Sequence, residues 1–223
     1  MVATARTLLA EGIGTALLLA IVVGSGIMGE TLAQGNAAVA LLANAMATGA
    51  GLYVLITLLG PISGAHFNPL VSMLLWWRGA CRGSTLSSYV AVQIAGAVAG
   101  VWIAHAMFGL PILQTGIKVR TGSGQWLGEV VASAGLLGTI VLASREHARS
   151  TAALVGAYVF AAYWFTSSTS FANPAVTIAR SLTQSFAGIR PADVPAFIAA
   201  QGAGTLLVCA AFRFLRIPHS AEP

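Results

Sequence analysis

Charge is the property that this sequence lacks most. Charged residues make up 8% of its 223 positions and hydrophobic residues 57%, whereas a soluble domain usually carries about 25% charged residues. So few charges cannot cover a solvated surface, and we therefore expect most of the surface to contact a lipid bilayer. For the same reason the net charge of +5 is not evidence of nucleic-acid binding, and no nucleic-acid partner is expected.

Cysteine is also scarce, and recognisable catalytic motifs are missing. The two cysteines, Cys81 and Cys209, show no CxxC spacing and predict neither a metal site nor a disulfide framework. The sequence contains no nucleophile paired with a base, no cluster of His and Cys, and no phosphate-binding loop. We therefore expect no cofactor and no metal, and we do not expect an enzyme.

Long uncharged stretches are what the sequence has instead. A helix needs about 20 residues to cross the hydrocarbon core of a bilayer, and breaks at glycine, proline and charged clusters delimit six stretches of roughly that length. These are residues 7–28, 37–59, 86–108, 125–144, 151–167 and 194–215. The sequence therefore predicts an all-α integral membrane protein with six transmembrane helices.

Two further apolar stretches, residues 69–77 and 174–183, are too short to cross a bilayer. Irregular backbone at membrane depth is tolerated only where protein buries it or water lines it. We therefore predict that both stretches are re-entrant half-helices, which enter the membrane and stop.

The chain contains two similar halves. The segment LLAEGIGTALLL around Glu11 resembles WLGEVVASAGLL around Glu129, and AVQIAGA around Gln93 resembles AAQGAGT around Gln201. Each half holds three long stretches and one short one. Because three is odd, the second half must have inverted topology, and inverted repeats place shared sites near the midplane.

These repeats predict one membrane domain over residues 1–223, with repeat one at about 1–110 and repeat two at about 120–217. Lysine and arginine predict its orientation, since they favour the cytoplasmic side. Seven would lie inside with both termini cytoplasmic, namely Arg6, Arg78, Arg82, Arg145, Arg149, Arg213 and Arg216. Four would lie outside, namely Lys118, Arg120, Arg180 and Arg190.

Each short stretch begins with an Asn-Pro pair, Asn68-Pro69 or Asn173-Pro174. Asn is a strong N-cap and Pro is favoured at the first helical position, so both pairs predict the start of a half-helix. The start of a helix carries unpaired N–H groups and the positive end of the dipole. Inversion brings the two starts face to face, where the Asn amides would offer hydrogen bonds to a neutral polar molecule and the dipoles would repel cations, including protons.

With these features the chain resembles the aquaporins, of the major intrinsic protein family. The resemblance covers almost the whole chain and rests on the glutamate pair, the glutamine pair and the two Asn-Pro loops. It implies an aquaporin-like inverted repeat with one pore per subunit, a homotetramer, and a place in the cell (inner) membrane. The pore centre would be formed by Asn68 and Asn173.

The Asn-Pro motifs depart from the family pattern at two positions. Leu70 stands where alanine is usual, and Val176 stands where most members have an arginine that narrows the outer filter, donates hydrogen bonds and adds positive charge. Arg180 follows roughly one helical turn later. We expect it to point elsewhere, deeper into the protein or along its rim.

The other filter positions follow from the resemblance by spacing. Thr48, twenty residues before Asn68, stands where water-selective members have a bulky aromatic residue, and Ser170 matches the loop position. The fifth-helix position is Tyr163 when counted from the helix and Ala161 when counted back from the second loop, and Tyr163 is favoured.

A filter of Thr48, Tyr163, Ser170 and Val176 would be wide and uncharged. It predicts a passive channel for water and small neutral solutes such as polyols, or neutral metalloid hydroxides such as arsenous acid.

Five polar residues have alternative interpretations. Glu11 and Glu129 are costly at membrane depth unless hydrogen-bonded; we expect them to support the two loops, whereas a proton relay would indicate an inverted-repeat secondary transporter. His66 is expected to be a fixed loop residue that can line the pore, with pH gating as the alternative. Gln93 and Gln201 either join helices or line the pore.

Overall fold

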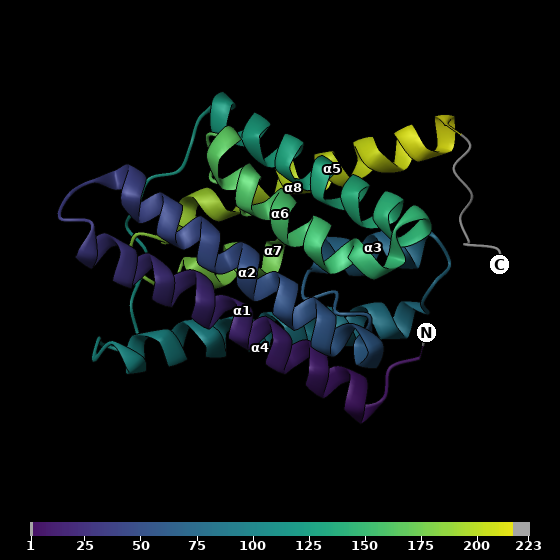
Figure 1. The fold of residues 1–223 in the computed structure, drawn as a ribbon, viewed down its shortest axis with the longest axis horizontal. Helices are drawn as coiled ribbons and strands as arrows, with labels where there is room; N and C mark the ends of the chain where they lie inside the picture. Colours follow the sequence, from purple (N-terminus) through teal and green to yellow (C-terminus); the bar gives the residue numbers. More distant parts are fainter. Residues whose placement is uncertain (1, 216–223) are drawn as a thin grey trace.

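The computed structural model describes residues 2–215, which form eight α-helices and two short 3-10 helices and contain no strand. The long helices run along the long axis of an elongated bundle (Figure 1). The long helices are α1 (Ala5–Leu32), α2 (Ala37–Ser63), α4 (Gly83–Met107), α5 (Ser123–Glu146), α6 (Thr151–Phe165) and α8 (Val194–Phe214). The short helices are α3 (Pro69–Trp77), α7 (Pro174–Arg180), η1 (Ala148–Ser150) and η2 (Pro191–Asp193).

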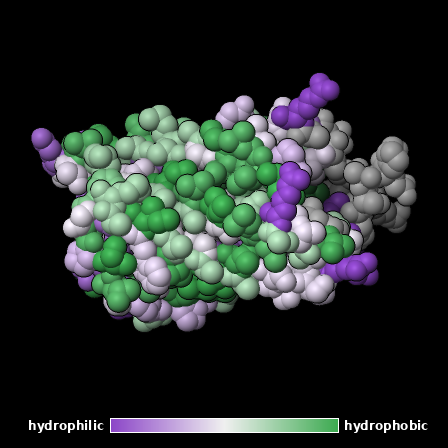
Figure 2. Space-filling view, turned by 90° about the horizontal axis from the view of Figure 1, so that it is seen from below, coloured by the Kyte–Doolittle hydropathy of each residue, from purple (hydrophilic) through white to green (hydrophobic). Residues whose placement is uncertain are grey.

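The six long helices correspond to the six predicted spans. Five of them are long and apolar enough to cross a membrane, and the sixth, α6, is an apolar helix of 15 residues that η1 directly precedes. Large apolar side chains such as Leu58, Met107 and Leu206 are exposed on the outer surface. Figure 2 shows hydrophobic residues across the middle of one face and hydrophilic ones toward its ends. The expected all-α membrane fold is confirmed.

Most helix boundaries differ from the prediction by a few residues, and two of them have an identifiable cause. The helix α2 was expected to end at residue 59 but continues through Pro61 to Ser63. Proline in the last turn removes only one helical hydrogen bond, and the helix ends at Gly64, whose φ of 87° suits a residue without a side chain. Conversely, α7 ends at Arg180, because Ser181 O accepts from Gly116 N at 2.7 Å rather than from a further helical turn.

Glycines allow the long helices to approach each other closely. A methyl group on Gly100 of α4 would overlap the carbonyl oxygen of Ala16 on α1, and one on Gly204 of α8 would overlap that of Val130 on α5. The α1–α4 pair of the first half thus packs as the α5–α8 pair does in the second half. Both glycines therefore serve close packing of helices within the chain.

The half-helices lie between the long helices. α3 follows the end of α2 and α7 follows the end of α6, so the two short helices enter from opposite ends of the bundle (Figure 1). α1 begins and α8 ends at the same end of the molecule. The proposed repeat boundaries remain a prediction; Arg216 and residues 216–217 of repeat two lie outside the described residues.

Candidate pore

A cavity of about 120 Å³ lies at the centre of the bundle, between α1, α2, α5, α6 and the two half-helix loops. Most of its walls are apolar, with polar groups at intervals. The polar lining residues are Thr48, His66, Asn68, Thr151, Tyr163, Ser170, Asn173 and Arg180. Among the described residues that line the cavity there is no aspartate or glutamate, so its only formal charge comes from Arg180 and, when protonated, His66.

Both half-helices begin at an asparagine that caps them. Asn68 Oδ1 accepts a hydrogen bond from Leu70 N at 2.9 Å. Asn173 Oδ1 accepts from Ala175 N at 3.0 Å and from Val176 N at 3.3 Å. Each side-chain oxygen thereby satisfies backbone N–H groups that a helix start leaves unpaired.

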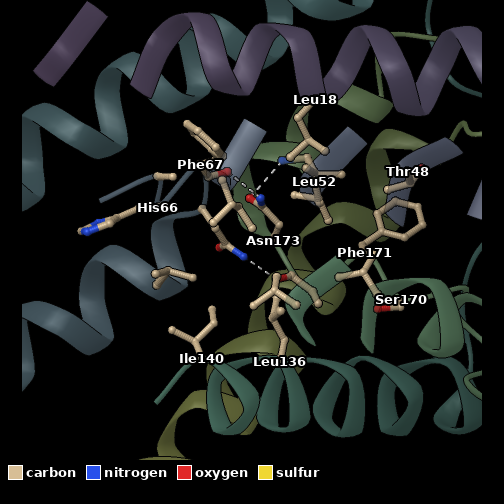
Figure 3. Close-up of a pocket in the computed structure, with 18 of the residues that line it drawn as sticks. Leu18, Thr48, Leu52, His66, Phe67, Leu136, Ile140, Ser170, Phe171 and Asn173 are labelled. Atoms are coloured by element: carbon tan, nitrogen blue, oxygen red, sulfur yellow. Dashed lines mark hydrogen bonds between the residues drawn. The ribbon is translucent and has the colours of Figure 1, made fainter. Parts of the chain in front are cut away.

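The same two asparagines also tie the loops to each other. Asn68 Nδ2 donates to the carbonyl of Ala172, and Asn173 Nδ2 donates to the carbonyl of Phe67, both at 2.8 Å. Figure 3 shows Asn173 and these bonds at the middle of the cavity. An amide nitrogen carries two hydrogens. One hydrogen of each amide is therefore engaged across the loops, and the other is available to a molecule in the cavity.

The backbone before each asparagine is unusual in the same way. Ala65 and Phe67 have φ values of 49° and 48°, and Ser170 and Ala172 have φ values of 48° and 46°. These are the third and the first positions before the asparagine in each loop. A left-handed conformation costs about 1–2 kcal/mol for a residue with a side chain, so other interactions must hold both loops in place.

Glu11 holds the first loop. Its carboxylate is fully buried and accepts from Ser63 Oγ at 2.7 Å and His66 N at 2.9 Å through one oxygen. The other oxygen accepts from Phe67 N and Gln93 Nε2, both at 2.8 Å. Four donors therefore surround the charge, and the carboxylate does not reach the cavity.

Glu129 occupies the matching position beneath the second loop. It is fully buried and accepts from Phe171 N at 2.8 Å, Ala172 N at 2.9 Å and Gln201 Nε2 at 2.6 Å. Three donors therefore occupy this carboxylate, and it does not line the cavity.

The two glutamines join long helices to half-helices. Gln93 Nε2 also donates to Ser72 on α3 at 3.0 Å, and Gln201 Nε2 to Thr177 on α7 at 2.8 Å. Neither glutamine lines the cavity.

The four residues expected to form the filter lie along one cavity. Thr48, Tyr163, Ser170 and Val176 are all buried and line it. Thr48 Oγ1 lies 3.4 Å from Tyr163 Oη. Ala161, the alternative at the fifth-helix position, is exposed on the outer surface of α6. The geometry therefore favours Tyr163 over Ala161.

His66 lies at the other end of the cavity from Thr48 and Ser170 (Figure 3). Its Nδ1 is 2.9 Å from Ser72 Oγ, and its ring packs edge-on against Tyr89 at 5.0 Å. These contacts hold the ring in one orientation. Its Nε2 is buried and has no hydrogen-bond partner among the described residues.

Arg180 is the residue whose place the sequence did not predict. It lines the same cavity as Val176 and is 1% exposed. Its Nε donates to the carbonyl of Ala187, and its guanidinium carbon lies 3.4 Å from the centroid of the Phe171 ring. Residues four apart share a helix face. The four-residue spacing of Val176 and Arg180 on α7 thus already indicated that both side chains face the same side of the helix.

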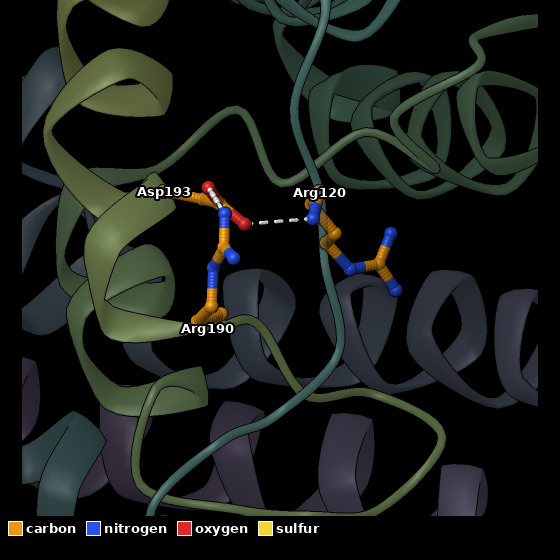
Figure 4. Close-up of polar contacts among 3 residues, drawn as sticks. All are labelled: Arg120, Arg190 and Asp193. Carbon is orange, nitrogen blue, oxygen red and sulfur yellow. Dashed lines mark hydrogen bonds and ion pairs between the residues drawn. The ribbon is translucent and has the colours of Figure 1, made fainter.

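A second buried arginine, Arg120, supports the outer loops. Its backbone N–H donates to Asp193 at 2.8 Å, while Asp193 pairs with Arg190 at 2.7 Å. The guanidinium points away from this carboxylate (Figure 4) and donates to the carbonyl of Gly188 at 2.9 Å. Burial lowers the pKa of Arg120 to about 10, so the group stays protonated near neutral pH.

Comparisons with known proteins identify the family. The major intrinsic protein family model matches residues 1–165. The chain is 52% identical, over 96% of its length and 91% of the relative's, to the aquaglyceroporin AqpS of Rhizobium meliloti. It is 35% identical to the glycerol uptake facilitator protein of Pseudomonas aeruginosa over 45% of its own length and 35% of that protein's. The crystal structure of the aquaglyceroporin from Plasmodium falciparum superimposes with a TM-score of 0.74 at 17% identity, covering 96% of this chain and 97% of that one.

The chain belongs to the major intrinsic protein family, as its sequence motifs indicated. Its fold and family define a multi-pass membrane channel rather than an enzyme.

Proposed function

We propose that this channel conducts water and small neutral solutes passively, and that it admits polyols such as glycerol and neutral metalloid hydroxides such as arsenous acid. The observation that carries the proposal is Val176, which presents a small apolar side chain to the cavity beside Thr48 and Ser170. A narrow water filter would need bulky side chains at these positions. The names of two similar proteins, an aquaglyceroporin and a glycerol uptake facilitator, agree with a polyol pore.

The chemistry of the cavity supports a channel over a coupled transporter. Coupling to an ion normally requires an acidic residue in the binding cavity. Glu11 and Glu129 are occupied by loop and glutamine donors, and no other carboxylate lines the cavity among the described residues. The remaining N–H groups of Asn68 and Asn173, together with the positive ends of α3 and α7, offer hydrogen bonds to neutral solutes and repel cations.

The proposal includes a homotetramer in the inner membrane with both termini cytoplasmic. α1 begins and α8 ends at the same end of the bundle, and the sequence assigns seven of the eleven lysines and arginines to that side, which the positive-inside rule places in the cytoplasm. Cross-linking of the purified protein would test the tetramer. Protease access to terminal tags in oriented vesicles would test the orientation.

The direct test is flux through liposomes that contain only the purified protein. Water, glycerol, urea and arsenous acid would be compared by light scattering or uptake, without any ion gradient, against empty liposomes. We expect water and glycerol flux well above the empty vesicles, and arsenous acid flux that follows its own gradient. Flux that appears only with a proton or sodium gradient would indicate a transporter, and water flux alone would refute the wider filter.

A further inference from the structure

We infer that Arg180 takes over the role that position 176 lacks: it places a cationic hydrogen-bond donor at the outer constriction, where it binds neutral polyhydroxylated solutes and excludes cations. The choice of solute rests on the proposed function, whereas the exclusion of cations does not.

The first step is the position of Arg180 relative to Val176. Both residues belong to α7 and both line the cavity. They are four residues apart, so their side chains share one face of the helix, and helical side chains lean toward the helix start. Since α7 starts at the central asparagine, the Arg180 side chain leans back toward Val176 and Ser170.

The second step is the way in which the guanidinium is held. Its Nε donates to the carbonyl of Ala187, and its guanidinium carbon lies 3.4 Å from the centroid of the Phe171 ring. The Phe171 backbone N–H is bound by Glu129 at 2.8 Å, and Arg120 contacts the same ring at 4.9 Å. These contacts hold the charged group against the loop that Glu129 supports.

The third step is what remains unbound. Arg180 Nη1 and Ser170 Oγ are both buried and have no hydrogen-bond partner among the described residues. Buried polar groups in folded proteins are almost always hydrogen-bonded. Both residues line the cavity, so we assign the missing partners to the molecules that pass through it.

The fourth step is charge. The structure pairs Arg190 with Asp193, and among the described residues no carboxylate lines the cavity beside Arg180. Glu129, which also acts on Arg180 electrostatically, lies behind the Phe171 loop, so no negative charge faces Arg180 on the side where solutes pass. Fixed positive charge in a narrow pore is a barrier to cations.

These features specify the kind of ligand. A guanidinium only donates hydrogen bonds, while a serine hydroxyl both donates and accepts. A neutral molecule with several hydroxyl groups can accept a hydrogen bond from Arg180 and can donate one to, or accept one from, Ser170. Its apolar side then lies against Val176. An ammonium or metal cation is repelled. The filter is thus wide at Val176, and Arg180 supplies its positive charge one helical turn further from the central asparagines.

The experiment compares Arg180→Met and Arg180→Lys with the wild type in protein-only liposomes, measuring proton leak, potassium leak, water flux and glycerol flux. Arg190→Gln is the matched control, because it removes one arginine from the outer rim without touching the cavity. We expect Arg180→Met to raise the cation leak at least tenfold and to lower the selectivity for glycerol over an apolar solute of similar size. Arg180→Lys should retain the cation barrier, and Arg190→Gln should behave as the wild type.

A second variant guards against a simple folding defect. In Val176→Arg/Arg180→Met the charge returns to the position that most of the family uses, so cation exclusion should recover while glycerol flux falls. If Arg180→Met does not fold, Arg180→Gln carries the test, because it keeps a polar side chain but removes the charge; it should leak cations, and a folded Arg180→Gln protein without cation leak would overturn the inference.

A folded Arg180→Met protein with unchanged cation leak and unchanged glycerol selectivity would overturn the inference and leave Arg180 as an anchor for the Phe171 loop. Equal loss of all fluxes without cation leak would overturn it as well. If the wild type conducts water but no glycerol, the proposed solute fails, yet the cation leak of Arg180→Met still decides the role of the arginine.

Discussion

Replacing Val176 with arginine tests the width of the filter. Val176 lines the cavity on the same face of α7 as Arg180, and side chains four residues apart on a helix have Cβ atoms about 5–6 Å apart. The substitution therefore introduces a second guanidinium beside the first one and fills space that valine leaves open. Solutes larger than water should be affected most.

The two guanidinium groups would repel each other. At a separation of about 6 Å and an effective dielectric constant of about 20, the repulsion is roughly 3 kcal/mol. A hydrogen bond from the new arginine to the free Ser170 hydroxyl would offset about 1.5–3 kcal/mol of this. We therefore expect a protein that folds with a small loss of stability. A tenfold fall in flux corresponds to only about 1.4 kcal/mol of added barrier, which steric narrowing readily supplies.

The assay is stopped-flow light scattering of liposomes under water and glycerol gradients, with uptake of arsenous acid as a third measurement. We expect glycerol and arsenous acid flux to fall at least tenfold and water flux by less than about threefold. Val176→Met is the control for side-chain length without charge, and the yield of folded oligomer is measured for every variant. Equal loss of water and larger solutes would show blockage, and no change in any flux would mean that Val176 does not face the pore.

Three further substitutions test the parts that hold the pore together. Asn173→Asp replaces the amide that donates to Phe67 with an oxygen and adds negative charge. We expect the free energy of unfolding to fall by about 1–3 kcal/mol and the proton leak, measured with a pH-sensitive dye in liposomes, to rise. Glu129→Gln removes at least one of three buried hydrogen bonds and the charge; the free energy of unfolding should fall by about 2–3 kcal/mol, seen as a lower melting temperature in detergent. Gly100→Ala forces α4 away from Ala16 and should destabilise the protein by about 1–3 kcal/mol in the same melting assay.

Each of these substitutions has a matched control on the same chain. Asn36→Asp keeps an exposed helix cap and should leave proton leak unchanged. Glu30→Gln changes an exposed carboxylate that accepts one N–H bond at 3.1 Å and should cost under about 1 kcal/mol. Gly202→Ala adds a methyl group where no atom lies within 4 Å and should stabilise α8 by up to about 1 kcal/mol. If a control is as damaging as its partner, the proposed local cause is wrong.

The sequence alone determined that the protein lies in a lipid bilayer, where its membrane-spanning helices fall, and where the two half-helices start. These depend on local chemistry: apolar length decides whether a segment can cross a bilayer, and an Asn-Pro pair can cap and begin a helix with only its own atoms. The matching order of Glu11 with Glu129 and of Gln93 with Gln201 was also visible, because a repeat preserves spacing. The family followed from the same motifs.

The ends of α2 and α7 needed the tertiary structure. A proline near a helix end is compatible with either stopping or one more turn, and only the backbone of Gly64 decides between them. Whether α7 continues past Arg180 depends on Gly116, which is far away in the chain and competes for the carbonyl of Ser181.

Which of the candidate filter residues line the cavity also needed the tertiary structure. Counting along the chain left Tyr163 and Ala161 as alternatives, because loop lengths shift the count, and only the rotation of α6 shows that one faces the cavity and the other the exterior. Arg180 was expected to point away from the filter. The four-residue spacing from Val176 indicates a shared helix face, but the direction of the side chain is set by the Ala187 carbonyl and the Phe171 ring, contacts that form only when separate loops fold against each other.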